Sequence, residues 1–260
     1  MQSITFYKYQ GTGNDFIMID GRIQEINLSN KNIQDFCNRR FGIGADGVII
    51  LKNHPTLDFE MDYYNADGSQ SMCGNGGRCA VQFARHMGLL KNEFHFLAID
   101  GEHLATIEEN EWVHLKMKDV NGVKSINNDY ELNTGSPHYI KLVAQLDNIN
   151  VVKEGRAIRN SESYEQEGIN VNFVQTINDT SIFVRTYERG VEDETLSCGT
   201  GVTAASLISA HNDRGFNRIE VETLGGKLAV EFDRISEEHF NNIWLCGPAT
   251  FVYKGEKALA

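Results

Sequence analysis

The stretch Asn65–Ala80, NADGSQSMCGNGGRCA, places a cysteine directly before three glycines and ahead of a segment that predicts a helix. Glycine inside a helix costs about 1 kcal/mol relative to alanine, so three glycines within four residues need a physical reason. A second stretch, Glu188–Ala205, ERGVEDETLSCGTGVTAA, repeats the Cys-Gly-x-Gly pattern and again leads into a run of small residues. This repeated turn is the feature from which we infer both fold and function.

Three segments recur in the same order and at nearly the same distance along the chain. The cysteines Cys73 and Cys198 are 125 positions apart, GIGADGV from Gly42 and GINVNFV from Gly168 are 126 apart, and TGNDFIMI from Thr12 and TGSPHYIKLV from Thr134 are 122 apart. Each match is short, but three in one order indicate a duplicated unit.

Local patterns predict the elements of each half. Runs of β-branched and aromatic residues at 16–20, 47–51, 172–177, 181–187 and 219–225 are typical of strands. Helices are predicted at 75–87, closed by Gly88, at 200–212, closed near Gly215, and at 33–39, after Ser29 or Asn30. We therefore expect an α+β fold of two pseudo-symmetric domains, each with a mostly antiparallel sheet and one prominent helix. The expected domains are 1–118, to which 250–260 returns, and 119–249.

Composition excludes several classes of function. The chain has 260 residues, of which 24 are basic and 36 acidic, and a formal net charge of −12. This balance disfavours nucleic acid or an anionic membrane surface as the main partner. The first residues carry no pattern of a secretory signal, and no apolar run approaches the ~20 residues of a membrane span. We expect a cytoplasmic protein whose partner is a small molecule.

The cysteines are expected to be free thiols. Their number is odd and no export signal accompanies them, which disfavours a disulfide framework. Neither a C-x-x-C nor an H-E-x-x-H motif is present, so we expect no metal site. Three cysteines are expected in the core: Cys37 in the helical segment NIQDFCNRR, Cys79 within its helix beside Ala80 and Val81, and Cys246 in the strand-like segment IWLCG.

The two remaining cysteines have a setting that suits acid–base chemistry. A helix N-terminus offers unpaired N–H groups and partial positive charge, which hold a carboxylate or phosphate and lower the pKa of a thiol. If the duplicated halves bring Cys73 and Cys198 to opposite faces of one carbon, one thiolate and one thiol are the base and the acid that inversion of a stereocentre needs. The N–H groups would then stabilise the carbanion-like transition state through its carboxylate.

Other interpretations stay open on the residues alone. The turn GTGNDF lacks the third glycine of a dinucleotide-binding motif, and CGNGGR lacks the lysine of a P-loop. The same turns would also suit an amino acid sensor without catalysis, or a redox pair in which Cys73 and Cys198 form a disulfide. We expect oxidation to join these two sulfurs reversibly, with loss of activity.

Three long motifs resemble the diaminopimelate epimerase family. They are GTGNDFIMID from Gly11, YNADGSQSMCGNGGRCA from Tyr64 and YERGVEDETLSCGTG from Tyr187, and the resemblance extends from about Phe6 to Glu256. Proline racemases, which also use two cysteines, lack the Glu-Arg-Gly segment, and phenazine-biosynthesis isomerases lack the cysteine pair. The resemblance implies two similar domains, each a sheet wrapped around a central helix, with the active site in the cleft between them. It further implies interconversion of LL- and meso-diaminopimelate for lysine and peptidoglycan precursor synthesis, without a cofactor, and commonly a homodimer.

The resemblance also implies roles for individual residues. Cys73 matches the proton donor and Cys198 the proton acceptor, with the roles exchanged in the reverse direction. Gly74, Asn75, Gly199 and Thr200 match the cradle of the reacting carboxylate. Further substrate-binding positions are Asn14, Asn65, Asn170, Glu188 and Arg189, and the groups that tune the thiols are His138 and Glu188. Two positions depart from the family pattern, because many members have Gln at Gly47 and Asn at Ser136.

Overall fold

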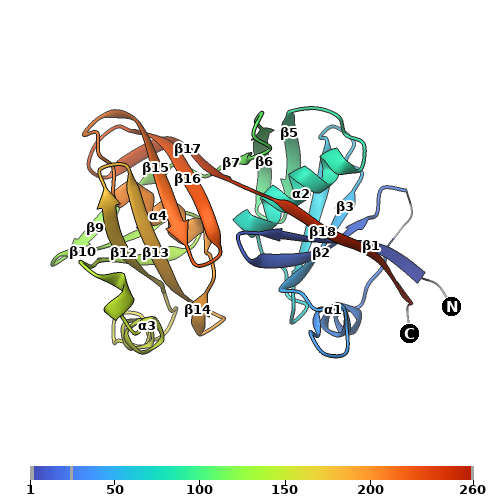
Figure 1. Cartoon of the computed structure of the whole chain (residues 1–260), viewed down its shortest axis with the longest axis horizontal. Coiled ribbons are helices and arrows are strands. Elements are labelled where there is room, and N and C mark those ends of the chain that lie inside the picture. Colours follow the sequence, from blue (N-terminus) through green and yellow to red (C-terminus); the bar gives the residue numbers. More distant parts are fainter. Residues whose placement is uncertain (1–2, 24–25, 259–260) are drawn as a thin grey trace. The chain divides into compact units, whose positions relative to one another are not determined.

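The computed structural model describes residues 3–23 and 26–258, which form two compact units (Figure 1). Unit 1 comprises Met1–Leu115 and Gly247–Ala260, and unit 2 comprises Lys116–Cys246. The domain boundaries expected from sequence stay a prediction, and residues 259 and 260 of the returning segment lie outside the described residues.

Unit 1 is a strand ladder in the order β18-β1-β2-β3-β4-β5-β6-β7. The pairs β2–β3 and β4–β5 are parallel and the others are antiparallel. Helix α1 (Asn30–Cys37) connects β2 to β3, and helix α2 (Gly74–His86) connects β4 to β5. The strands are β1 (Ser3–Gly11), β2 (Asn14–Asp20), β3 (Gly47–Lys52), β4 (Phe59–Asn65), β5 (Glu93–Ala98), β6 (Gly101–Ile107), β7 (Val113–Lys116) and β18 (Thr250–Ala258).

Unit 2 has the ladder β9-β10-β11-β12-β13-β15-β16-β17-β8, with β14 paired to the end of β13. Its parallel pairs are β11–β12 and β13–β15. Helix α3 (Val151–Arg159), preceded by the 3₁₀ turn η1 (Leu146–Asn148), connects β11 to β12, and helix α4 (Gly199–Ile208) lies between β14 and β15. The strands are β8 (Val120–Asn121), β9 (Val123–Ile126), β10 (Asp129–Asn133), β11 (Pro137–Leu142), β12 (Asn170–Asn178), β13 (Ser181–Glu188), β14 (Asp193–Thr195), β15 (Gly215–Thr223), β16 (Gly226–Arg234) and β17 (His239–Gly247).

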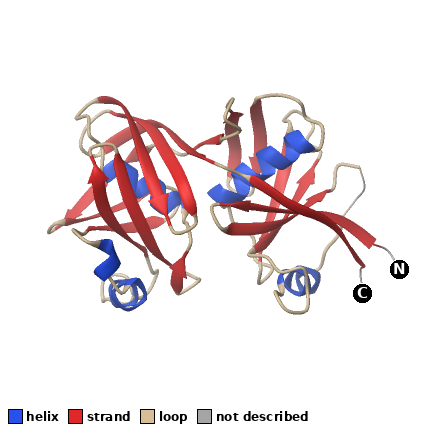
Figure 2. Cartoon of the chain, in the orientation of Figure 1, coloured by secondary structure: helices blue, strands red, loops and turns tan. Residues whose placement is uncertain are grey.

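One helix in each unit is surrounded by strands (Figure 2). In unit 1, α2 contacts β1, β2, β3, β4, β6 and β18; in unit 2, α4 contacts β10, β11, β12, β13, β15 and β16. Helix α4 is buried over nearly its whole length, as expected of a helix that is apolar on all sides. Its buried Thr203 and Ser206 satisfy their hydroxyls by donating to the carbonyls four residues earlier, at 2.9 Å each. The expected α+β class and the central helices are confirmed.

The two units repeat one topology, which defines equivalent positions. A parallel β–α–β crossover, an antiparallel step, a second β–α–β crossover and two antiparallel steps follow in the same order in each. Phe16 pairs with Gly47 between β2 and β3, and His138 pairs with Asn170 between β11 and β12. The offset of 122 makes Phe16 equivalent to His138, so their partners Gly47 and Asn170 are equivalent as well and lie 123 positions apart. The sequence match from Gly42 to Gly168, at 126, is therefore wrong by three residues.

Two predicted helices differ from the observed ones: α1 spans Asn30–Cys37 rather than 33–39, and α4 is shorter than predicted. Helix α4 ends at Ile208 rather than at residue 212, because the Asn212 backbone N–H and amide bond Asn217 and Phe216 in the turn that enters β15. Gly215, with a φ of +84°, begins β15 and does not cap α4. Helix α2 is closed by Gly88 as predicted, and the Ser29 capping box starts α1 at Asn30.

Helix α3 was not predicted. Its sequence VVKEGRAIR carries a glycine at its centre, which weakens a helical pattern. In the fold, a Cβ on Gly155 would lie 2.4 Å from the Cβ of Tyr187, so the helix packs onto β13 only with glycine there. The contact with Tyr187 thus requires glycine at position 155, and this glycine is the residue that weakens the helical pattern in the sequence.

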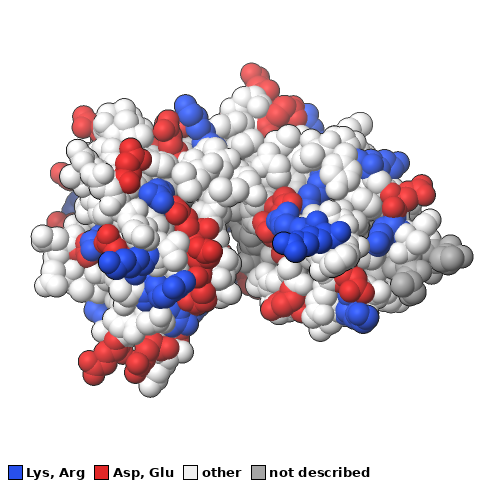
Figure 3. All heavy atoms as spheres, turned by 60° about the horizontal axis from the view of Figure 1, so that its bottom comes forward, with Lys and Arg blue, Asp and Glu red and all other residues white. Residues whose placement is uncertain are grey.

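Charged side chains are interspersed on the molecular face shown in Figure 3, with acidic and basic groups close to one another on both units. Among the described residues, none of the helices combines the length and apolar character that a membrane crossing demands.

Candidate active site

Both cysteines singled out by the sequence are the N-cap residues of the central helices. Cys73 precedes α2 and Cys198 precedes α4, each with an extended backbone, at φ −131° and −115° respectively. The first helical hydrogen bonds are equivalent as well, from Gly77 N to Cys73 O and from Val202 N to Cys198 O, at 2.8 Å each. The predicted placement of the two thiols at helix N-termini is confirmed.

The backbone at both N-termini suits an anion. The first N–H groups of a helix have no partner within it, and here they belong to Gly74, Asn75, Gly199 and Thr200. Neither helix has an acidic residue in its first turn, so no carboxylate of the helix itself competes for the dipole. Each turn can therefore hold a carboxylate beside a thiol.

In unit 1 the structure joins Asn14, Cys73 and Asn75. The Cys73 thiol donates to Asn14 Oδ1 at 3.4 Å, and Asn75 Nδ2 donates to the same oxygen at 3.4 Å. Asn14 Nδ2 donates to Asp46 Oδ2 at 2.6 Å. Asn65, at the end of β4, donates to Ser69 Oγ and Ser71 Oγ, at 3.0 and 3.1 Å.

Asp46, which accepts the hydrogen bond from Asn14, belongs to a charged cluster. Arg39 Nη2 donates to Asp46 Oδ1 at 2.7 Å and to Asp15 Oδ1 at 2.6 Å, while Lys8 pairs with Asp15 at 2.6 Å. Burial opposes ionisation of Asp15, but the hydrogen bonds with Arg39 and Lys8 outweigh it and lower its pKa to about 2. Asp46 is not among the site residues predicted from the sequence, although it lies directly before β3 in the segment GADG.

In unit 2 the structure joins His138, Asn170 and Thr200 through Ser136. Ser136 Oγ lies 2.9 Å from His138 Nε2, 3.3 Å from Asn170 Nδ2 and 3.1 Å from Thr200 Oγ1. Thr200 Oγ1 in turn lies 3.5 Å from Cys198 Sγ. Ser136 thus links the predicted tuning histidine to the helix turn.

The Glu-Arg pair lies at the end of β13 in the same unit. Glu188 is the last residue of the strand, and the Arg189 backbone N–H donates to Asn170 Oδ1 at 2.9 Å. Arg189 Nη1 donates to the Glu167 carbonyl at 2.9 Å. A guanidinium has five N–H donors, so Arg189 retains donors suited to a substrate carboxylate.

His138 is neutral in the folded protein. Its side chain is completely buried, and this burial, with a smaller contribution from the nearby Arg189 charge, lowers its pKa to about 3. It therefore acts as a hydrogen-bonding imidazole and carries no charge near neutral pH. The sequence-based role of tuning a thiol then has to operate through hydrogen bonds.

Acid should destabilise the protein through His138. The folded-state pKa is below the ordinary value near 6.5, so the stabilisation is complete above that value and is lost as the pH falls towards 3. Between pH 7 and pH 5 this group should lower the free energy of unfolding by about 2 kcal/mol. Denaturant unfolding of the wild type and of His138→Gln checks this, because the variant should lose that part of the pH dependence.

The titration of Asp15 adds little between pH 7 and pH 5, because the ordinary carboxyl pKa of 3.8 and the lowered pKa of about 2 in the folded protein both lie below this range. Equal pH dependence of wild type and His138→Gln between pH 7 and pH 5 would contradict a neutral buried imidazole.

Several site residues occupy equivalent positions in the two units. Cβ atoms built on Gly76 and Gly201, the third residues of α2 and α4, would meet Ile49 Cδ1 at 3.1 Å and Asn172 Oδ1 at 2.2 Å. Ile49 and Asn172 follow the 123-residue offset, which also relates Gly47 to Asn170 and Asn65 to Glu188. The offset of 122 relates Asn14 to Ser136. Asn172 is not among the site residues predicted from the sequence, and the corrected repeat is the signal that identifies it.

The departure at Gly47 has a steric reason. A Cβ there would lie 2.5 Å from both Tyr63 Cε2 and the Tyr64 backbone oxygen, so a longer side chain requires β4 to shift. Ser136, the other departure, is smaller than asparagine and leaves room for the hydroxyl contacts described above.

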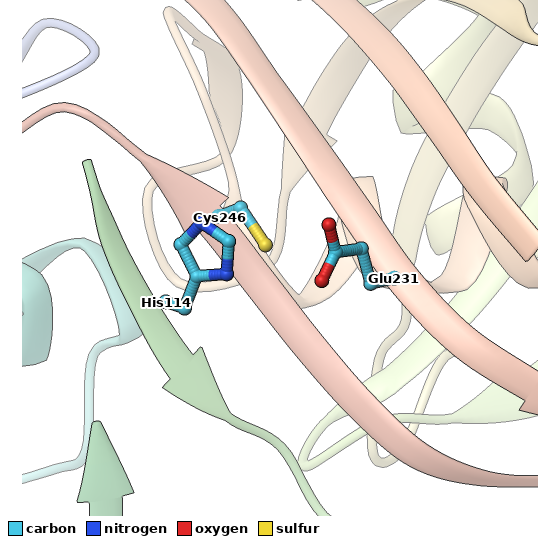
Figure 4. Close-up of side chains that lie close together, drawn as sticks. All are labelled: His114, Glu231 and Cys246. Atoms are coloured by element: carbon cyan, nitrogen blue, oxygen red, sulfur yellow. The ribbon is translucent and has the colours of Figure 1, made fainter. Parts of the chain in front are cut away.

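The remaining cysteines are buried, as predicted. Burial raises the pKa of Cys37 and of Cys79 to about 12, so both stay protonated. Cys246 is fully buried on β17, near Glu231 of the neighbouring strand β16 (Figure 4). Glu231 is bound by Arg218. The two thiols at the helix N-termini are thus set apart from the other three.

Comparison with known proteins agrees with the motifs. The family model described as diaminopimelate epimerase matches residues 6–123 and 130–252. The diaminopimelate epimerase of Flavobacterium psychrophilum is 53% identical over 251 residues, covering 95% of this chain and 98% of the relative. That of Chlorobaculum tepidum is 41% identical over 256 residues, covering 94% and 98%.

Solved structures share the fold at low identity. A phenazine biosynthesis protein of the PhzF family from Bacillus anthracis superposes with a TM-score of 0.76 at 17% identity, covering 100% of both chains. A hydroxyproline epimerase from Agrobacterium vitis has a TM-score of 0.69 at 12% identity, covering 99% of this chain and 91% of the other. The family model spans both repeats and both cysteine turns, and the sequence relatives match almost the whole length of this chain. The chain therefore belongs to the diaminopimelate epimerase family.

Proposed function

We propose that this protein interconverts LL- and meso-diaminopimelate, with Cys198 and Cys73 as the two proton-transfer groups. The observation that carries this proposal is that both thiols are N-cap residues of equivalent central helices in two units of one topology. The reaction moves one proton on each side of a carbon and needs no change of oxidation state. It serves lysine and peptidoglycan precursor synthesis.

In the proposed forward step, the Cys198 thiolate removes the α-proton, the C–H bond breaks and its electron pair stays on carbon. The Cys73 S–H bond then breaks as its proton is transferred to the opposite face of that carbon. The helix N–H groups of Gly74, Asn75, Gly199 and Thr200 stabilise the charge that spreads into the carboxylate. In the reverse direction the two sulfurs exchange roles.

The distal end of the substrate is assigned to polar side chains around the two turns. Arg189 offers a bidentate contact for a carboxylate, Glu188 accepts from an ammonium group, and Asn14, Asn65 and Asn170 complete the hydrogen bonds. The proposal keeps the domains 1–118, with 250–260, and 119–249, each of which contributes one of the two thiols. We also propose that the protein is a homodimer in the cytoplasm. Oxidation is expected to join Cys73 and Cys198 in a reversible disulfide.

Isotope exchange tests the function directly. We expect LL-diaminopimelate, incubated with the protein in D₂O under reducing conditions and without added cofactor, to gain deuterium at the α-carbon while meso-diaminopimelate forms. Mass spectrometry follows the label, and separation of the stereoisomers follows inversion. Tight binding without exchange would instead support an amino acid sensor. Turnover that depends on a reductant would support a thiol redox protein.

A further inference from the structure

The hydroxyl of Tyr63 contacts one of the predicted substrate-binding side chains. Tyr63 and Asn65 lie two residues apart on β4, so their side chains point to the same face of the sheet. The Tyr63 hydroxyl donates to Asn65 Oδ1 at 2.9 Å, while the residue as a whole is only 6% exposed. This hydrogen bond ties a buried ring to a residue that the proposed function assigns to the substrate.

The direction of the hydrogen bond follows from the other end of the Asn65 amide. That end lies 3.3 Å from the Ser69 backbone oxygen, which can only accept, so it must be the nitrogen Nδ2. Nδ2 also lies 3.0 Å from Ser69 Oγ and 3.1 Å from Ser71 Oγ. The end of the amide that faces Tyr63 is then the oxygen, so the phenol is the donor. Contacts at both ends thus fix the orientation of the amide.

The place of the Tyr63 ring depends on the missing side chain at Gly47. Tyr63 pairs with Ile49 across β4 and β3, and Gly47 lies two residues before Ile49 on the same face of β3. A Cβ on Gly47 would lie 2.5 Å from Tyr63 Cε2, so the ring covers this glycine. The ring also meets Phe16, the partner of Gly47 on β2, edge-on, with centroids 5.8 Å apart and planes at 80°. A side chain at position 47 would displace the ring.

This face of the sheet is the one on which the first turn of α2 packs. A Cβ on Gly76 would lie 3.1 Å from Ile49 Cδ1, 3.5 Å from Cys73 Cβ and 3.6 Å from Phe16 Cε1. The side chains beside the Tyr63 ring are therefore also those beneath the turn that carries the thiol. The phenol belongs to the surroundings of the candidate active site in unit 1.

We propose that Tyr63 is a positioning residue for the substrate, because it fixes the amide of Asn65 while its ring occupies the room over Gly47. Many family members have glutamine at position 47, and this chain has no side chain there. The ring of Tyr63 on β4 fills that place, and its hydroxyl holds the neighbouring amide in one orientation. The inference rests on the proposed function for the identity of the substrate.

The orientation matters because the two ends of an amide are alike in shape and opposite in function. The nitrogen donates and the oxygen accepts, so only one orientation matches a given group of the substrate. An amide that is fixed before binding loses less conformational entropy when the substrate arrives. Removal of the phenol oxygen should therefore weaken binding, whereas proton transfer at the two helix N-termini should continue at nearly the same rate.

The variant Tyr63→Phe tests this role with the loss of a single oxygen atom. It keeps the ring, the edge-on contact with Phe16 and the cover over Gly47. We expect KM for LL-diaminopimelate to rise about tenfold and kcat to stay within about twofold of the wild type. Stereoisomer separation over time measures both constants, and thermal unfolding checks that the variant is folded.

Tyr64→Phe is the matched control. It makes the same chemical change one residue further along β4, on the opposite face, where Tyr64 packs against the hydrophobic cluster that contains Ile33 and Phe36 of α1. This variant should retain the wild-type KM. An equal rise of KM in both variants would show that any loss of a phenol from β4 disturbs the protein, and would contradict a specific role of Tyr63.

The variant Asn65→Ala shows whether Tyr63 acts through Asn65. Without the amide the phenol has nothing to position, so adding Tyr63→Phe to Asn65→Ala should change KM by less than about twofold. A tenfold effect of Tyr63→Phe in both backgrounds would mean that the phenol acts independently of the amide, and the inference would be wrong.

Calorimetric titration with meso-diaminopimelate separates this inference from the proposed function, because it requires no turnover. The Kd of Tyr63→Phe should be about tenfold above that of the wild type, and the Kd of Tyr64→Phe should be unchanged. This pattern in a protein that never exchanges the α-proton would overturn the proposed function and leave the role of Tyr63 standing.

Three results would overturn the role of Tyr63. The first is a folded Tyr63→Phe variant with wild-type KM and Kd. The second is a fall of kcat in this variant at constant KM, since that would place the phenol in the chemical step. The third is a wild-type protein that does not bind meso-diaminopimelate, which would overturn the proposed function as well.

Discussion

Alanine in place of either Cys73 or Cys198 is expected to lower the rate of epimerisation about a thousandfold, because general acid–base groups of this kind contribute 10²–10⁴-fold. Inversion needs a proton acceptor and a proton donor on opposite faces, and each variant removes one of them. Stereoisomer separation over time measures the loss.

Deuterium exchange gives a sharper result for the same variants. Cys73→Ala retains the base at Cys198, so one epimer should still exchange its α-proton with solvent while keeping its configuration. Cys198→Ala should do the same for the other epimer. Cys246→Ala, which removes a buried thiol far from either helix N-terminus in sequence, is the control and should epimerise like the wild type. Inversion by either single variant at the wild-type rate would remove that cysteine from the catalytic pair.

Alanine at Gly201 is expected to destabilise the protein by about 3 kcal/mol and to lower kcat about 100-fold. The new Cβ would overlap Asn172 Oδ1, at 2.2 Å, and this oxygen holds the amide that orients His138. Displacing Asn172 therefore disturbs both the packing of α4 and the hydrogen bonds that lead to Cys198. Denaturant unfolding and steady-state kinetics measure the two effects.

The equivalent glycine in unit 1 is a matched control. At Gly76 the new Cβ meets only the end of the flexible Ile49 side chain, at 3.1 Å, and alanine also favours the helix. Gly76→Ala should change the free energy of unfolding by no more than about 1 kcal/mol. Similar losses in both variants would show that the helix turn, and not the contact with Asn172, makes glycine necessary.

The sequence by itself determined the class of the fold, the duplication and the position of both reactive thiols. These depend on local signals: glycines after a cysteine, a run of small residues that must be buried, and β-branched segments between them. Such patterns act within a few residues along the chain, which is why the starts of α2 and α4 followed from them.

Only the tertiary structure decided the register of the repeat, the existence of α3 and the surroundings of each sulfur. Asn14 meets Asp46, Ser136 meets Thr200, and Asn172 meets His138 across 32, 64 and 34 positions of sequence. The direction of an amide or a hydroxyl depends on which partner can only donate or only accept, and strand pairing determines that partner. A pattern in the sequence identifies the two cysteines, but the side chains that surround each sulfur are brought there by contacts that exist only after folding.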